Sequence, residues 1–366
     1  LWKDIQKILR HKIHLVNLSV EPVTCEAIAL FTLKRKFVNN TFEPPMILNF
    51  KSKYCKLWKG KNGYMYDAKS TLADLKRFVI QQKEFTQKPK LSISNLAWNT
   101  HDDSKVAKIL KENDVKFIEI APSNIWLDPT SQPDKEIEKY KQFWARKGIK
   151  IVATTHILSP YPELQIFKSL LSRRRSLAYL KKMVRVSTLL GAQAINFGSP
   201  KNRLKGNLPL REAEIIAIDF FKEISEECAR FNVNFALEPN PHIYGGDFIL
   251  KTRQAIALAK EVNHKNFGIN VDMSTMTVNK EDFGSTLKLA LPYAKHFHLS
   301  EPYLKPIPQN KLDHKRLSQA VKRSKYSGYL SIEMKIANSE NCLYNLSSTL
   351  KFVKNTYFKY DKSKKN

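Results

Sequence analysis

Residues 234–240 read NFALEPN and residues 267–273 read FGINVDM, with the amphipathic stretch Lys251–Val262 between them. Each short apolar run ends in an acidic residue, Glu238 in the first and Asp272 in the second. A strand, a helix and a second strand at this spacing are typical of a βαβ unit, in which the two strands lie parallel. We therefore expect this stretch to form one repeat of an α/β fold.

The same alternation of apolar runs and amphipathic stretches extends from about residue 89 toward the C-terminus. The predicted strands are Leu91–Leu96, Val115–Ala121, Ile149–Thr154, Ala192–Gly198, Asn234–Glu238, Phe267–Val271, His296–Leu299 and Tyr329–Met334. Eight strands, each followed by a helix, over about 250 residues predict a (β/α)8 TIM barrel. An open doubly wound sheet is the competing topology, but it more often has a Gly-rich turn after its first strand, and residues 97–100 (AWNT) contain no glycine.

Three segments are expected along the chain. Residues 1–88 do not follow the repeat and predict a small α+β extension, with helices over Leu1–Leu9, Thr24–Leu33 and Thr71–Gln82, a strand over His14–Val20, and a polar linker over Gln82–Lys90. Residues 89–340 form the barrel. Residues 341–366 carry one more helix, over Leu343–Phe358, and a basic tail.

Composition and charge narrow the class of protein. Of the 366 residues 42% are hydrophobic, which supplies a large core, but no apolar stretch is long enough to cross a membrane. The net charge is +28, from 62 Lys+Arg against 34 Asp+Glu, yet the cations are spread along the chain rather than clustered into a binding arm. Nucleic acid is therefore not expected as a partner. The four cysteines form no CxxC pair and no secretory signal opens the chain, so we expect a cytoplasmic protein.

Four successive predicted strands deliver a metal-binding side chain where they end. These residues are Glu238, Asp272, His296 or His298, and Glu333. The carboxyl ends of all strands in such a barrel meet at one mouth, and a lone carboxylate buried there would be costly. Three carboxylates and one imidazole suit a divalent metal ion, Mn²⁺, Mg²⁺, Co²⁺ or Zn²⁺.

On these residues, 89–336 resemble the xylose isomerase-like TIM barrels, specifically the sugar isomerases and epimerases that share their fold with endonuclease IV. The Glu-Pro after strand five, the Asp after strand six, the His-x-His-Leu-Ser-Glu segment and the Ile-Glu of strand eight carry the resemblance. It implies a metal held by Glu238, Asp272, His298 and Glu333. It further implies that Glu238 and Glu333 act as the catalytic pair, one removing and one returning a proton on opposite faces of a sugar or sugar phosphate through a metal-stabilised enediolate.

Other residues at or near strand ends are candidates for substrate binding. Trp98, His156, Asn196, Asn240 and Glu301 could contact sugar hydroxyls or stack on the ring. Lys201 and Arg203, in the loop after strand four, could pair with an anionic substrate. A homodimer is the oligomeric state considered, and the sequence does not decide it.

The chain departs from the family at positions that contact substrate. The related epimerases carry a His where this chain has Thr275 and a Glu where it has Tyr244. A barrel that has lost catalysis and serves as an accessory or interaction domain in polysaccharide biosynthesis is therefore the second hypothesis. An endonuclease IV-like phosphodiesterase is the third, and it lacks the additional histidines for three metals.

Residues 16–29 resemble a different family, the C-terminal lobe of extended short-chain dehydrogenases and epimerases that act on nucleotide sugars. The matching pieces are Val16–Leu18, Glu21–Thr24 and Glu26–Ala29. No GxxGxxG fingerprint accompanies them, so no dinucleotide cofactor is expected in this chain.

Overall fold

The computed structural model describes residues 2–11, 13, 16, 18–36, 49–86, 88–309, 312–335 and 341–359. They belong to two compact units, Leu1–Gln87 and Lys88–Asn366. In the second unit eight parallel strands close into a barrel, where each strand pairs with the next and β8 pairs with β1. This confirms the predicted (β/α)8 barrel. The strands are β1 (Lys90–Ser94), β2 (Phe117–Ile120), β3 (Lys150–Thr154), β4 (Ala194–Phe197), β5 (Asn234–Leu237), β6 (Phe267–Asp272), β7 (Ala294–Ser300) and β8 (Tyr329–Glu333).

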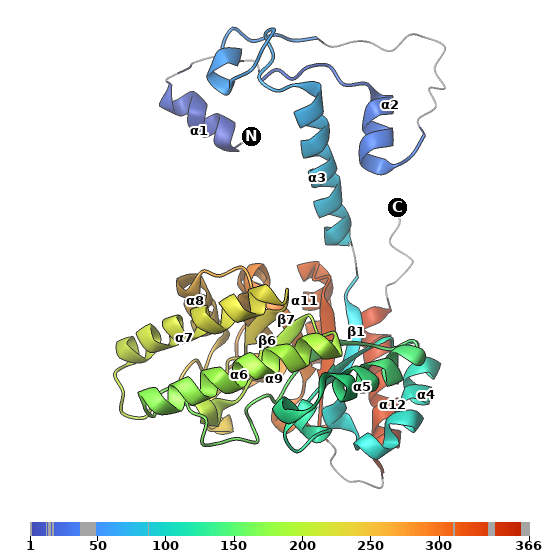
Figure 1. Cartoon of the computed structure of the whole chain (residues 1–366). Coiled ribbons are helices and arrows are strands. Elements are labelled where there is room, and N and C mark those ends of the chain that lie inside the picture. Colours follow the sequence, from blue (N-terminus) through green and yellow to red (C-terminus); the bar gives the residue numbers. More distant parts are fainter. Residues whose placement is uncertain are drawn as a thin grey trace. The chain divides into compact units, whose positions relative to one another are not determined.

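Helices connect the strands and pack around them (Figure 1). They are α4 (Asp103–Glu112), α5 (Asp134–Arg146), α6 (Leu170–Leu190), α7 (Leu210–Arg230), α8 (Thr252–Val262), α9 (Met273–Val278), α10 (Phe283–Ala290), α11 (His314–Ser324) and α12 (Cys342–Val353). Two helices, α9 and α10, separate β6 from β7, where the sequence predicted a single helix. The extra helix α9 begins directly after Asp272, whose side chain accepts a hydrogen bond from the backbone N–H of Thr275.

The strands are buried on both faces, and helix α7 illustrates why. Its buried residues Ala213, Ala217, Phe221 and Ile224 recur every three or four positions and so lie on one face of the helix. The Phe221 ring packs against Phe235 of β5 and Phe267 of β6, with ring centroids 6.0 and 5.0 Å apart. Helices thus cover the outer faces of the strands, and the inner faces enclose the barrel interior, which accounts for the nearly continuous apolar runs in the sequence.

Strand β7 shows that polar side chains also enter the barrel interior. Successive side chains of a strand point to opposite faces. Phe297 packs outward against Tyr326, with ring centroids 5.3 Å apart, while His296, His298 and Ser300 share the inner face and are buried. Polar side chains therefore line the barrel interior along β7 from His296 to Ser300.

The first unit is mostly helical in the part of the chain that the structure describes. It contains α1 (Trp2–Arg10), α2 (Cys25–Ile28) with a π-helical turn (Ala29–Leu33), a 3₁₀ turn (Cys55–Trp58) and α3 (Ala68–Thr86). Its β structure there consists of two isolated bridges, Val20 with Tyr66 and Lys61 with Tyr64. The predicted strand His14–Val20 lies partly outside the described residues. The predicted linker from Gln82 is wrong in its first half, because α3 continues to Thr86.

Candidate active site

The ends of four neighbouring strands bring Glu238, Asp272, His298 and Glu333 together. Glu238 follows β5 directly, Asp272 and Glu333 end β6 and β8, and His298 lies two residues before the end of β7. One ligand atom from each lies within 4.8 Å of the others, and all four side chains are buried. These are the four residues that the sequence pointed to. In the strand register Asp272 pairs with His298, and Ser300 pairs with Glu333. The pairing of the strands therefore sets the spacing of these side chains.

Hydrogen bonds hold these carboxylates in place. Glu238 accepts from Nδ2 of Asn240 through Oε1, at 2.9 Å, and from Nδ2 of Asn270 through Oε2, at 2.7 Å. Asp272 accepts from the Ser300 hydroxyl through Oδ2. The Nδ1 atom of His298 lies 3.2 Å from Oε2 of Glu238 and 3.2 Å from Oε2 of Glu333. The imidazole thus contacts two carboxylates that come from β5 and β8, three strands apart in the barrel.

The crowding of buried charges shifts several pKa values. Burial, reinforced by the charge of Glu238, raises the pKa of Asp272 to about 7. Burial alone would lower the pKa of His298, but the carboxylates of Glu333 and Glu119 outweigh it and raise that pKa well above its usual range. Burial likewise opposes ionisation of Glu238, yet its contact with His298 lowers the pKa of the carboxyl. The site therefore gathers more negative charge than its own imidazole can balance.

This arrangement fits a divalent metal ion. Two ligands on opposite sides of an ion bound at about 2.1 Å lie about 4.2 Å apart, and these four atoms all lie within 4.8 Å of one another. Gly198 leaves room beside them, because a Cβ atom there would lie 2.9 Å from Oε1 of Glu238. A cation at this point would also relieve the repulsion that raises the pKa of Asp272.

A cavity of about 560 Å³ opens above the four residues. This volume is in the range of pockets that take small molecules. Glu238, Asp272 and Glu333 lie in its wall. Its other lining residues include Thr155, His156, Ser159, Lys201, Asn240, Tyr244, Ser274, Tyr303 and Lys335.

Of the predicted substrate-binding residues, His156, Asn240 and Lys201 line this cavity. Burial lowers the pKa of His156, which favours a neutral ring that can both donate and accept hydrogen bonds. Asn196 lies inside the barrel, where its Nδ2 is 3.3 Å from Nε2 of His298. It contacts a member of the cluster rather than the cavity.

Three predicted substrate-binding residues point elsewhere, and for them the prediction is corrected. Trp98 is buried in the core, where its Nε1–H donates to Asp103 at 2.7 Å. Glu301 accepts from Nε2 of His314 at 2.9 Å. Arg203 is 1% exposed and donates to the backbone carbonyls of Glu238 and Phe248, at 2.6 and 3.2 Å. Each of these side chains is held by its own buried partner and is absent from the cavity wall.

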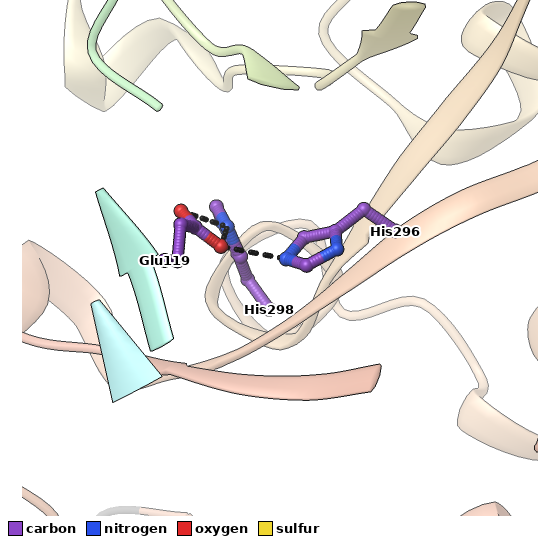
Figure 2. A group of neighbouring side chains, drawn as sticks. All are labelled: Glu119, His296 and His298. Carbon is purple, nitrogen blue, oxygen red and sulfur yellow. Dashed lines mark hydrogen bonds and ion pairs between the residues drawn. The ribbon is translucent and has the colours of Figure 1, made fainter. Parts of the chain in front are cut away.

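The sequence analysis missed Glu119, which lies in β2 and is fully buried. Figure 2 shows its carboxylate beside His298, with dashed lines from its oxygens to the rings of both His298 and His296. The missed signal was an acidic residue inside the run Phe117–Ile120, next to apolar residues on either side. Tyr244, Tyr303 and Lys335 also went unassigned, although they line the cavity.

The fold and the site define a class of protein. A (β/α)8 barrel with three carboxylates and a histidine at the ends of β5 to β8 is matched, over residues 107–354, by the model of the family described as xylose isomerase-like TIM barrel. The chain belongs to this family. No protein with a curated description matches its sequence.

Solved structures of sugar epimerases share the fold. A D-psicose 3-epimerase crystallised with D-fructose superimposes with a TM-score of 0.64 at 13% identity, over 73% of this chain and 99% of that one. A 3-keto-D-glucoside 4-epimerase from E. coli gives a TM-score of 0.60 at 17% identity, over 73% and 100% of the two chains. The IolI protein with a bound zinc atom gives 0.56 at 16% identity, over 74% and 100%.

Proposed function

We propose that this protein is a divalent-metal-dependent isomerase or epimerase acting on a sugar or sugar phosphate. The observation that carries the proposal is the pair Glu238 and Glu333, each 3.2 Å from the same imidazole nitrogen and both in the wall of one cavity. Epimerisation next to a carbonyl needs one group to remove a proton and another to return it from the opposite face. Two carboxylates that reach the same point from β5 and β8, three strands apart in the barrel, can meet that need.

The metal would be held by Glu238, Asp272, His298 and Glu333. When bound, a divalent ion supplies Lewis-acid polarisation of a substrate carbonyl, which makes the neighbouring C–H more acidic. Asn240 and Asn270 each donate to one oxygen of Glu238 and so orient its carboxylate. The neutral ring of His156 can exchange hydrogen bonds with substrate hydroxyls.

The lysines of the cavity wall favour an anionic substrate among the sugars. Lys201 and Lys335 both line the cavity and are exposed there, so their ammonium groups are free to reach into it. A phosphate or carboxylate group on the substrate would pair with them through charge-assisted hydrogen bonds. Arg203 does not join this group, because its guanidinium is bound to backbone carbonyls.

Solvent-deuterium exchange tests the proposed reaction. We expect the protein, supplied with Mn²⁺ or Co²⁺ in D₂O, to exchange the proton next to the carbonyl of one or more ketoses or ketose phosphates and to form the epimer or isomer. Proton NMR follows both events in one sample. Binding of sugars without any exchange, with metal present, would contradict the enzyme proposal and support the accessory domain.

Two positions, Thr275 and Tyr244, favour the accessory domain as the second candidate function. Thr275, where the related epimerases carry a histidine, is fully buried and donates its hydroxyl to the carbonyl of Pro239 at 2.8 Å. Tyr244 donates or accepts a hydrogen bond with Ser274 at 2.6 Å in place of the family's glutamate. A chain without these two groups has fewer polar contacts to offer a substrate.

Several earlier expectations stay predictions. The family match begins at residue 107, so it does not reach the unit Leu1–Gln87, and the resemblance of that unit to nucleotide-sugar dehydrogenases is untested. The cytoplasmic location and the homodimer are likewise untested. Within the described residues no helix is long and apolar enough to span a membrane.

A further inference from the structure

The three side chains in Figure 2 form a buried cluster beneath the candidate metal centre. Oε2 of Glu119 lies 2.6 Å from Nε2 of His296, and Oε1 of Glu119 lies 3.0 Å from Nε2 of His298. Glu119 belongs to β2 and the two histidines to β7, so the contacts cross the barrel interior. Glu119 and His298 are fully buried, and His296 is 1% exposed.

The two nitrogens of His298 face different surroundings. Nδ1 faces Glu238 and Glu333, with Nδ2 of Asn270 also 2.9 Å away. Nε2 faces Glu119, with Nδ2 of Asn196 at 3.3 Å. The shorter contact at Nε2 is the one to the carboxylate. An ionised carboxylate only accepts hydrogen bonds, so this contact requires a hydrogen on Nε2.

That requirement decides what Nδ1 can do. A neutral imidazole carries one hydrogen, and when Nε2 holds it, Nδ1 keeps its lone pair. Without a metal ion, Nδ1 faces the carboxylates of Glu238 and Glu333 at 3.2 Å, which favour a second hydrogen there. A bound cation would displace that hydrogen, while Glu119 keeps the one on Nε2. The lone pair then points toward the carboxylates of the candidate centre, where a metal ligand must point.

We propose that Glu119 is a positioning residue that fixes His298 with its hydrogen on Nε2 and so keeps Nδ1 available as the metal ligand. This inference rests on the metal centre of the proposed function. Carboxylates that accept a hydrogen bond from a metal-binding histidine orient the ring and make it a stronger ligand. His296 supports Glu119 by donating to its second oxygen, and in this role it binds no metal itself.

A second metal ion held by Glu119, His296 and His298 is the competing interpretation. Ligands around a tetrahedral ion at about 2.0 Å lie about 3.3 Å apart. The contacts of 2.6 and 3.0 Å from Glu119 to the two rings are shorter than that and are those of hydrogen bonds. The geometry thus favours direct contact between these groups.

Nitrogen-15 NMR of the histidine rings in the metal-free protein tests the tautomer directly. We expect the His298 ring to carry a hydrogen on Nε2 in the wild-type protein, and to lose this preference in Glu119→Gln, whose amide can donate to the ring. A His298 ring without a hydrogen on Nε2 in the wild-type protein would overturn the proposal, whereas a second hydrogen on Nδ1 is expected while the carboxylates of Glu238 and Glu333 face that nitrogen without a metal ion. This measurement needs no metal, so its result is separate from whether the centre binds one.

Metal affinity, measured by calorimetry with Mn²⁺ or Co²⁺, is the second readout. We expect Glu119→Gln to weaken binding by about 10- to 100-fold. Glu301→Gln is the matched control, because it also alters a buried carboxylate that accepts from a histidine, His314, but does not touch His298. The control should leave metal affinity within about twofold of wild type.

Each outcome decides between the alternatives. Wild-type affinity in a folded Glu119→Gln variant would overturn the proposal, and so would two bound ions per chain of which the variant loses one. A wild-type protein that binds no metal but shows the expected tautomer would contradict the proposed function and leave the hydrogen-bonding role of Glu119 standing. If Glu119→Gln fails to fold, the presence or absence of a hydrogen on Nε2 of His298 in the wild-type protein still tests the proposal.

Discussion

Glu238 and Glu333 lie at the ends of β5 and β8, three strands apart in the barrel, yet the Oε2 atom of each lies 3.2 Å from the same nitrogen, Nδ1 of His298. Their backbones are fixed by different strand pairs, β5 with β6 and β8 with β7. Neither carboxylate can therefore move to replace the other. The Oε2 atoms of the two carboxylates are equally far from Nδ1 of His298 but lie in different directions from it. Removal of a proton by one group and its return by another require two groups placed in this way.

Replacing either carboxylate should stop proton exchange. In Glu238→Gln and in Glu333→Gln we expect solvent-deuterium incorporation to fall at least 1000-fold, because an amide can neither accept the proton nor bind a metal ion as a carboxylate does. His296→Gln should lose less, since the hydrogen bond of His296 goes to Glu119 and His296 is not one of the four candidate metal ligands. Equal losses in His296→Gln and His298→Gln, followed by NMR in D₂O, would show that the wrong histidine has been assigned.

Removing metal should make stability depend on pH through Asp272. Its pKa is raised to about 7 in the folded protein, against about 3.9 in an unfolded chain, so the folded state binds the extra proton. That contribution to the free energy of unfolding is complete below about pH 4 and is lost as the pH rises through 7. We expect the Tm of the EDTA-treated protein to fall between pH 6 and 8, and the Asp272→Asn variant to show a smaller fall.

A bound metal ion should restore the stability that the wild-type protein loses as the pH rises. A ligand at 100 times its Kd stabilises the folded state by about 2.7 kcal/mol, so Mn²⁺ or Co²⁺ should raise the Tm at pH 8. Asp272→Asn should show a much weaker response, because it lacks one of the four ligands. A wild-type Tm that does not change with any of Mn²⁺, Mg²⁺, Co²⁺ or Zn²⁺ contradicts the metal centre.

The barrel and the four residues of the centre were predictable from the sequence for one physical reason. Strands buried on both faces must be nearly continuous apolar runs, so an acidic residue at the end of such a run stands out, as Glu238 does after Leu237. Parallel strands then bring those ends to one mouth. Sequence position therefore indicated that the three carboxylates would meet, whereas the choice of His298 over His296 came from the family resemblance.

Glu119 and Arg203 were not predictable in this way. Glu119 lies within its strand rather than at the end, and its partners are distant in sequence, so only the closed barrel reveals the contact. Arg203 lies in the loop at the mouth as expected, but the direction of a long side chain depends on which carbonyls are left without donors nearby.

Helix α3 continues beyond Gln82, where the linker was expected to begin. Gln, Lys and Glu are good helix formers, and the first helix-breaking residue is Pro89.

Lys201 and Arg203, both in the loop after β4, should behave differently on substitution. Lys201→Ala should raise KM for an anionic sugar severalfold, with less effect at high salt and no effect on a neutral sugar, because Lys201 lines the cavity. Arg203→Ala should instead lower the free energy of unfolding, by about 3 kcal/mol, because it leaves buried carbonyls of Glu238 and Phe248 without their donor. Steady-state kinetics and urea unfolding separate the two; a KM change in Arg203→Ala at unchanged stability would return Arg203 to the substrate site.

Gly198→Ala should damage the centre without unfolding the barrel. A Cβ atom at this position would lie 2.9 Å from Oε1 and 3.0 Å from Cδ of Glu238, closer than carbon and oxygen atoms approach, so the carboxylate must move. Because Glu238 is tied to Asn240 and Asn270, its movement breaks at least one of those hydrogen bonds. We expect metal affinity to fall about tenfold or more, as it does when the groups that orient a ligand are lost. Gly284→Ala in α10 is the matched control, since its nearest neighbour would be 3.7 Å away and alanine favours the helix. Calorimetric titration of both variants with Mn²⁺ checks this, and equal affinities would mean that Glu238 does not bind the ion.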